Sequence, residues 1–86
     1  MVDGPVTIEV RVQLKRGVQD AEAESIEKSL RLLGLEGLSE VHTARVFSLT
    51  FTGISTEQAR SAAQRAVEQL LANPVIHRVE IATLTT

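Results

Sequence analysis

A regular alternation of apolar and polar side chains over residues 6–15 is the feature that most restricts the fold of this chain. The apolar positions are Val6, Ile8, Val10, Val12 and Leu14, and a polar or charged residue follows each of them. A period of two predicts a β-strand with one buried face and one solvated face. Because a strand buried on both faces would be apolar throughout, the pattern favours a sheet covered on one side only, with helices on its apolar face.

A helix is predicted after this strand, beginning near Asp20 and ending at Gly34. Asp20 suits the N-cap position, and Gly34 suits the left-handed residue that commonly follows a helix. Apolar residues recur at helical spacing along one side of this segment, at Ala23, Ile26, Leu30 and Leu33. The chain therefore begins with a strand followed by an amphipathic helix.

The segment 38–52 changes its apolar parity partway along. Its apolar residues fall into two phases, Ala44 and Val46 in one and Phe47, Leu49 and Phe51 in the other. A slip of one residue moves every side chain of a strand to the opposite face. We therefore predict a bulge or a tight hairpin in this segment, and favour two short strands, 39–45 and 46–52.

A second helix and a sharp corner are predicted next. Ser55 followed by Gln58 has the pattern of a capping box, which marks a helix start. The apolar stripe that follows is rich in alanine, which allows close approach to a sheet: Ala59, Ala62, Ala63, Ala66, Val67, Leu70 and Leu71. Asn73 can adopt the left-handed cap conformation, and Pro74 has no amide hydrogen with which to continue a helix. A final strand is expected to place Val75, Val79 and Ile81 on one side.

The element order β, α, β(β), α, β predicts one α+β domain over residues 1–86. We expect a two-layer α/β sandwich related to the ferredoxin-like fold, with an antiparallel sheet and two helices on one face. Such a fold leaves one sheet face and two sheet edges open to association. Because the open face of the first strand is polar, association is expected at the edges or through the Phe47–Phe51 region. A small aliphatic core also favours stabilisation by association.

Composition excludes several classes of site. The 86 residues include no Cys, which excludes disulfides and thiolate metal sites and suits a reducing compartment. We find no secretory leader and no apolar stretch long enough to cross a bilayer, so a soluble, cytoplasmic protein is expected. A formal net charge of −2, spread along the chain, provides no basic surface for a nucleic-acid backbone.

Few residues have the spacing of a catalytic or ligand-binding site. His42 and His77 are the only imidazoles and have no metal-ligand spacing, so both are expected to be solvent-facing strand residues. The segment 15–17 (Lys-Arg-Gly) is expected to be a strand end and turn, with anion contact as the alternative. Phe47 and Phe51 share a strand face, which is typical of core residues, with base stacking as the alternative. The sequence therefore predicts no catalytic, cofactor-binding or metal site in this chain.

Three segments have a recognisable family pattern. Residues 12–20 fit V-x-L-K-x-G-V-x-D, Leu33-Gly34 fits a Leu-Gly helix end, and residues 70–76 read L-L-A-N-P-V-I. In this order, over nearly the whole chain, they resemble the PurS family, the small subunit of phosphoribosylformylglycinamidine (FGAM) synthase. The chain departs from that family at three places: residues 20–23 replace Asp-Pro-Gln-Gly, residues 41–45 replace V-R-x-G-K, and His77 replaces an acidic residue.

The resemblance implies a single PurS-like domain that acts as a noncatalytic subunit in purine biosynthesis. The enzyme converts formylglycinamide ribonucleotide to formylglycinamidine ribonucleotide with ATP and glutamine. The resemblance implies that the chain joins a synthetase (PurL-type) and a glutaminase (PurQ-type) subunit, as a homodimer or dimer of dimers, and supports ammonia transfer. ATP, Mg and glutamine would be used by the partners, with no cofactor on this chain. Partner contacts are expected in two segments, at Lys15, Arg16, Gly17 and Asp20, and at Asn73, Pro74, Val75 and Ile76.

Two other functions are compatible with the element order. The first is a regulatory module of the ACT kind, which would bind a small molecule near the turn at Gly17-Val18. The second is an RNA-binding module that uses the sheet face, which would need basic and aromatic side chains together. Specific binding of an amino acid would indicate the former, and retention of RNA would indicate the latter.

Overall fold

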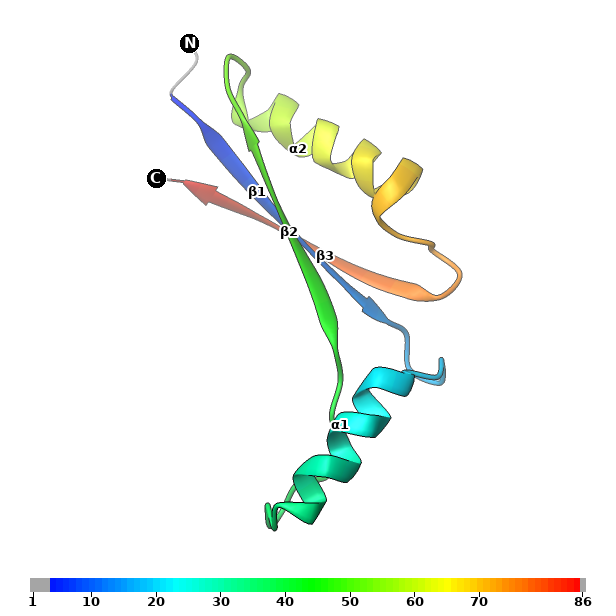
Figure 1. Cartoon of the computed structure of the whole chain (residues 1–86). Coiled ribbons are helices and arrows are strands. Elements are labelled where there is room, and N and C mark those ends of the chain that lie inside the picture. Colours follow the sequence, from blue (N-terminus) through cyan, green and yellow to red (C-terminus); the bar gives the residue numbers. More distant parts are fainter. Residues whose placement is uncertain (1–3, 86) are drawn as a thin grey trace.

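Three antiparallel strands form the sheet of this α+β protein, seen in a computed structural model that describes residues 4–85 (Figure 1). The strands are β1 (Val6–Leu14), β2 (Ala44–Phe51) and β3 (His77–Thr85), with β1 in the centre. The helices are α1 (Ala21–Leu32) and α2 (Thr56–Ala66), and α2 continues into a π-helical turn, η1 (Val67–Leu71). Residues 1–3 and 86 of the predicted domain lie outside the described residues. No helix within residues 4–85 combines the length and apolarity needed to cross a membrane.

The alternation in β1 produces the predicted buried face. Val6, Ile8, Val10 and Val12 are buried, and Ile8 and Val10 have no exposed surface. The register places Phe51, Leu49 and Phe47 of β2 opposite the first three of these residues. Ala59 and Ala63 of α2 and Val67 of η1 belong to the same cluster. The expected packing of an alanine-rich helix on the apolar face of the sheet is therefore confirmed for α2.

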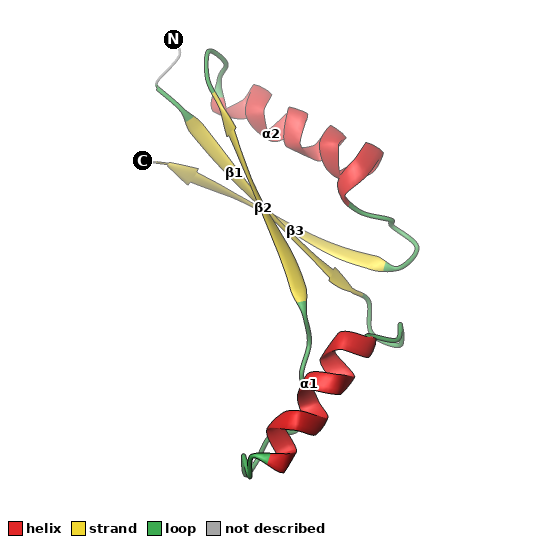
Figure 2. Ribbon diagram, in the orientation of Figure 1, coloured by secondary structure: helices red, strands yellow, loops and turns green. Residues whose placement is uncertain are grey.

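The predicted hairpin at 39–45 and 46–52 is wrong. A single strand, β2, pairs with β1 in uninterrupted register from Ala44 to Phe51, and residues 39–43 precede it without strand structure (Figure 2). The parity change arises because Val46 lies opposite Arg11 on the open face, where it is 50% exposed. The interpretation failed because it treated every apolar residue as a core residue, although isolated apolar side chains are common on surfaces.

The second helix begins as expected and ends differently. The Ser55 hydroxyl accepts from the Gln58 amide, and the Gln58 side chain accepts from the Ser55 amide, so the capping box is present. Near its end the helix widens into η1, closed by the bond from the Ala72 amide to the Val67 carbonyl, which spans five residues. This change of pitch rotates Leu70 out of the predicted apolar stripe, and Leu70 is 84% exposed.

The first helix has the predicted caps but not the predicted packing. The Asp20 carboxylate accepts from the Ala23 amide at its start, and the amides of Gly34 and Leu35 bond to the carbonyls of Arg31 and Leu30 at its end. Gly34 has φ +82°, which completes a Schellman motif. Figure 1 shows that α1 extends beyond the end of the sheet, whereas α2 crosses one face of it. The expectation of two helices on one face is therefore wrong within a single chain.

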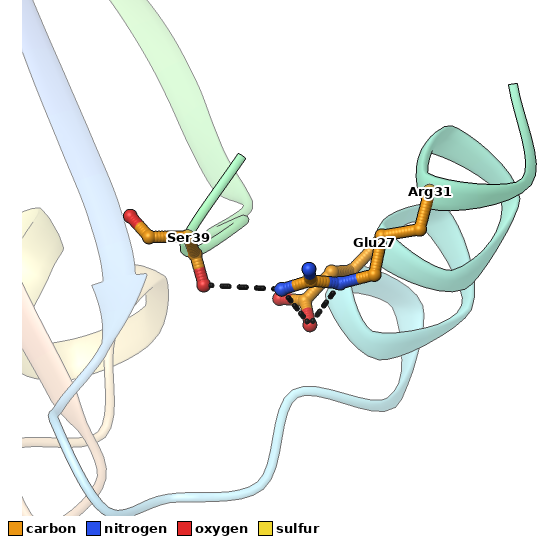
Figure 3. A network of polar contacts seen from close by, with 3 residues as sticks. All are labelled: Glu27, Arg31 and Ser39. Carbon is orange, nitrogen blue, oxygen red and sulfur yellow. Dashed lines mark hydrogen bonds and ion pairs between the residues drawn. The ribbon is translucent and has the colours of Figure 1, made fainter. Parts of the chain in front are cut away.

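The segment that leaves α1 returns alongside it to β2. The guanidinium of Arg31 bonds to the Glu27 carboxylate at 3.2 and 3.3 Å and donates to the Ser39 carbonyl at 3.4 Å (Figure 3). These contacts tie residues 33–43 to the helix. The resulting molecule measures 54 × 28 × 14 Å and has a radius of gyration of 16.8 Å. A compact chain of this length has a radius of gyration of about 12 Å, so the fold of one chain is elongated.

Candidate partner-binding site

The two segments singled out in the sequence lie next to each other. Antiparallel pairing of β1 with β3 places Leu14 opposite His77, and the Lys15 amide continues the pairing with a 2.8 Å bond to the Ile76 carbonyl. The turn that follows β1 and the corner that precedes β3 are thus joined at one end of the sheet (Figure 1). Segments about sixty residues apart in sequence form one surface.

The turn after β1 is a β-turn closed by the bond from the Val18 amide to the Lys15 carbonyl, 3.1 Å long. Gly17 occupies its third position with φ +89°, a conformation that favours glycine and is typical of a type II turn. The turn exposes the side chains of Lys15 and Arg16 at the end of the sheet. Glycine at residue 17 is therefore needed for the backbone, whatever this turn contacts.

Asp20 connects two parts of the chain. One carboxylate oxygen caps α1 through the Ala23 amide at 2.9 Å, and the other accepts from the Thr43 hydroxyl at 2.7 Å and the Thr43 amide at 3.3 Å. These bonds lower the pKa of Asp20, the Ala23 amide most strongly and the Thr43 side chain next. Asp20 thus fixes the start of α1 to the entry of β2, which explains its presence without a partner contact.

The corner before β3 is built around Asn73, but not in the predicted left-handed conformation. Within residues 4–85, only glycines have positive φ. Instead the Asn73 side-chain oxygen accepts from the Val75 amide at 2.9 Å, and its carbonyl accepts from the amides of Ile76 at 3.1 Å and His77 at 2.8 Å. The Asn73 amide donates to Nδ1 of His77 at 2.9 Å, so that ring nitrogen is the acceptor in this hydrogen bond. This is an Asx turn, in which the short amide side chain replaces a backbone acceptor.

The corner also changes the predicted final strand. β3 begins at His77, so Val75 belongs to the turn and is 76% exposed, rather than sharing a strand face with Val79 and Ile81. The prediction extended the strand two residues too early because Val and Ile favour strands. The backbone bonds made by Asn73 determine the local conformation instead.

A groove with an excess of basic side chains runs from the open face of the sheet to the turn. We call it the basic groove, and its volume is about 480 Å³. Its cationic side chains come from two strands and the turn, and they are Arg11, Lys15, Arg16 and Arg78. Asp20, Glu40 and His42 line it on the side of α1 and the return segment. Glu40 bonds to Nε2 of His42 at 2.8 Å, and this hydrogen bond, with the charges of His42 and Arg16, lowers the pKa of Glu40.

The corner forms a second hollow beside the basic groove. Pro74, Ala72 and His77 line it together with Val67 and Glu68 of η1. Lys15 and Arg78 line both hollows, so the turn and the corner present one continuous surface.

The predicted site residues thus lie together at one end of the sheet, some in the two hollows and some in the turn between them. Lys15, Arg16, Gly17 and Asp20 line the basic groove, and Pro74 lines the hollow at the corner. Asn73, Val75 and Ile76 form the adjoining turn. Arg11 and Arg78 were missed. The polar phase of β1 carries Arg11, and the open face of β3 carries Arg78, so charge on that polar face was the available signal.

The two histidines are occupied in local hydrogen bonds rather than gathered with other ligands. His42 is exposed and bonds to Glu40, whereas His77 is half-buried and bonds to the Asn73 amide. Each histidine meets the expectation of a solvent-facing strand residue only in part, because His42 is exposed but precedes β2, and His77 begins β3 but is half-buried. No group of three His, Cys, Asp or Glu side chains within residues 4–85 could hold a metal ion.

Phe47 is half-buried in the core beneath α2, and the guanidinium of Arg45 lies 5.6 Å from the centre of its ring. The core interpretation of Phe47 and Phe51 is therefore confirmed over base stacking.

Comparison with known proteins identifies the family. Residues 7–85 match the family model PurS, described as phosphoribosylformylglycinamidine (FGAM) synthase. The chain belongs to the PurS family. A curated relative from Archaeoglobus fulgidus, named phosphoribosylformylglycinamidine synthase subunit PurS, is 41% identical over 73 residues, which cover 85% of this chain and 91% of the relative.

Solved PurS structures have the same fold. The PurS of Methanocaldococcus jannaschii, described as one of the subunits of formylglycinamide ribonucleotide amidotransferase in the purine biosynthetic pathway, has a TM-score of 0.81 and 30% identity. It covers 94% of this chain, which in turn covers 98% of it. The structure of PurLQS from Thermotoga maritima contains a chain with a TM-score of 0.83 and 26% identity, covering 93% of this chain and 98% of that one. The family resemblance and the α+β class predicted from the sequence are confirmed.

Proposed function

We propose that this chain is the PurS subunit of an FGAM synthase in purine biosynthesis and that it performs no bond-making itself. Its match to the PurS family over residues 7–85 carries the proposal. The named relatives are subunits of this enzyme, and in Thermotoga maritima a PurS chain occurs in a PurLQS structure. The match also favours this function over the ACT-like alternative.

The role we propose is assembly. The chain joins a PurL-type synthetase to a PurQ-type glutaminase, so that ammonia released from glutamine reaches the synthetase. ATP, Mg and glutamine are then bound by those partners. Several ionisable side chains form hydrogen bonds within the chain, which supports a structural role: Asp20 caps a helix, Glu40 pairs with His42, and His77 accepts from the Asn73 amide at the corner. The continuous surface formed by the turn and the corner is the proposed partner contact.

The chain acts in this assembly as a homodimer or a dimer of dimers. Support comes from α1, whose apolar stripe has no sheet to cover within its own chain. Ile26 is 38% exposed and Leu33 is 75% exposed, which is unusual for the apolar side of an amphipathic helix. A second copy could bury these side chains by the same surface on both subunits.

Reconstitution tests the proposal directly. The purified chain is expected to show neither ligase nor glutaminase activity, and to restore glutamine-dependent amidation when added to its cognate PurL-type and PurQ-type subunits. Ammonium chloride as nitrogen source provides the control, because externally supplied ammonia bypasses transfer between subunits. With ammonium chloride, adding the chain should change the amidation rate far less than it does with glutamine. Full glutamine-dependent activity from the two partners alone would reject the assembly role, and turnover by the isolated chain would reject the noncatalytic one.

A further inference from the structure

We propose that the basic groove binds an acidic segment of the PurL-type subunit, through Asp or Glu side chains that contact Lys15, Arg16 and Arg11. The inference rests on the proposed assembly function and specifies the chemistry of the partner. It also extends the contact beyond the turn and the corner, to the open face of β1 and β3.

The charges of the groove are unequally satisfied. Its two carboxylates are already engaged, Asp20 with the Ala23 amide and Thr43, and Glu40 with His42. Of the four cations, Arg78 pairs with Glu80 at 3.4 Å. The other three, Lys15, Arg16 and Arg11, form no side-chain hydrogen bond or ion pair across residues 4–85. The groove therefore presents unpaired positive charge to a partner.

Charge that is spread along the sequence is distributed unevenly over the surface of the fold. The protein has a formal net charge of −2 and nine Lys and Arg residues, and four of these nine line the basic groove. Concentration of cations on one surface of an acidic protein produces a local positive potential, which speeds association with an acidic surface and selects against basic ones.

A protein segment fits this groove better than a small anion does. The cations are exposed and come from β1, the turn and β3. Among residues 4–84, no polar or charged residue is buried. Exposed single contacts are weak in salt, so a small anion would find little to hold it. An extended segment can contact several of these charges together. Apolar side chains nearby, Val46 on the open face and Val75 at the corner, provide the exposed apolar area that interfaces combine with a charged rim.

Association kinetics with the cognate PurL-type subunit test the inference. The groove variant Lys15→Glu with Arg16→Glu is compared with the control Lys28→Glu with Arg65→Glu, which makes the same chemical changes at exposed helix positions outside both hollows. Circular dichroism checks the fold of each variant. At low salt we expect the groove variant to lower the association rate at least tenfold and to weaken its dependence on NaCl, and the control to stay within twofold.

Each outcome has a separate meaning. If the wild-type chain does not bind the partner, the proposed function fails. If the wild type binds and both double variants bind alike, the function survives and the inference is rejected. Competition by inorganic phosphate beyond that of NaCl at equal ionic strength would also reject it, by showing a small-anion site. Should the groove variant not fold, Arg11→Gln replaces it, with an expected threefold or greater loss of association rate; an unchanged rate would overturn the proposal.

Discussion

The Asn73 corner offers a sharp test of how this fold turns from helix to strand. The left-handed and Asx-turn interpretations predict opposite results for two substitutions. Asn73→Asp keeps a side-chain oxygen that can accept from the Val75 amide, whereas Asn73→Gly removes that acceptor and keeps every backbone conformation accessible. Because no residue other than glycine has positive φ between residues 4 and 85, we expect aspartate to be tolerated and glycine to destabilise the protein.

The magnitude follows from the contacts at the corner. Loss of one neutral hydrogen bond costs about 0.5–1.5 kcal/mol in the free energy of unfolding. The added flexibility of glycine in the unfolded chain costs about 0.4–1 kcal/mol more. Asn73→Gly is therefore expected to cost about 1–2.5 kcal/mol, and Asn73→Asp less than about 0.5 kcal/mol. For a domain of this size, the glycine variant should lower Tm by about 5–15 °C.

Thermal unfolding followed by circular dichroism measures these differences at one fixed protomer concentration, since assembly makes Tm depend on concentration. Thr52→Gly, at an exposed loop residue whose side chain forms no hydrogen bond within residues 4–85, measures the general cost of glycine. A glycine variant at residue 73 as stable as wild type, together with a destabilised aspartate variant, would refute the Asx turn and restore the left-handed cap.

Two further predictions concern α1. Asp20→Asn keeps an oxygen for the Ala23 amide but replaces the acceptor for Thr43. The pKa of Asp20 is lowered in the folded state, so the ionised carboxylate contributes to the free energy of unfolding above its unfolded pKa. This contribution is lost as pH falls through the folded pKa. The variant should therefore have a lower Tm at pH 7 and a smaller fall in Tm between pH 5 and pH 3, and parallel acid limbs would contradict this. Leu33→Asp should reduce the mass measured by light scattering, because burial of one leucine in each subunit of a dimer stabilises the dimer by about 3–6 kcal/mol in all, or at least a hundredfold in Kd. Ser25→Asp is the control. An unchanged mass for Leu33→Asp would exclude an α1 interface.

Features set by local side chains were predictable from the sequence. The strand β1 follows from its alternation, and both helix starts follow from caps whose donors and acceptors are within three residues, Asp20 with Ala23 and Ser55 with Gln58. The two segments of the candidate site were also predictable, but only by resemblance. Their contact, from the Lys15 amide to the Ile76 carbonyl, depends on the register between β1 and β3. Register is a property of the sheet and not of either segment.

The errors arose where one residue type can act in two ways. Asparagine ends helices both by a left-handed backbone and by side-chain hydrogen bonding, and the sequence around Asn73 is compatible with both. Valine occurs in cores and, singly, on surfaces, so Val46 suggested a hairpin that does not exist. The π-turn that exposes Leu70 has no residue signature in this segment, because the alanines and leucines before it are ordinary helix formers.

The position of α1 shows what an amphipathic pattern specifies. The spacing of Ala23, Ile26 and Leu33 requires a surface that covers one side of the helix, and the prediction assigned that surface to the sheet of the same chain. The structure instead buries Ala23, leaves Ile26 and Leu33 exposed, and fixes α1 away from the sheet, through Asp20 at its start and Arg31 along the return segment. A helix that is already formed and held by hydrogen bonds at both its start and its return segment has less conformational freedom to lose when a second copy covers it, so association buries apolar area at a smaller entropic cost. We propose one physical explanation for the elongated shape and the exposed apolar side chains of α1, which is that part of the core of this protein forms between subunits.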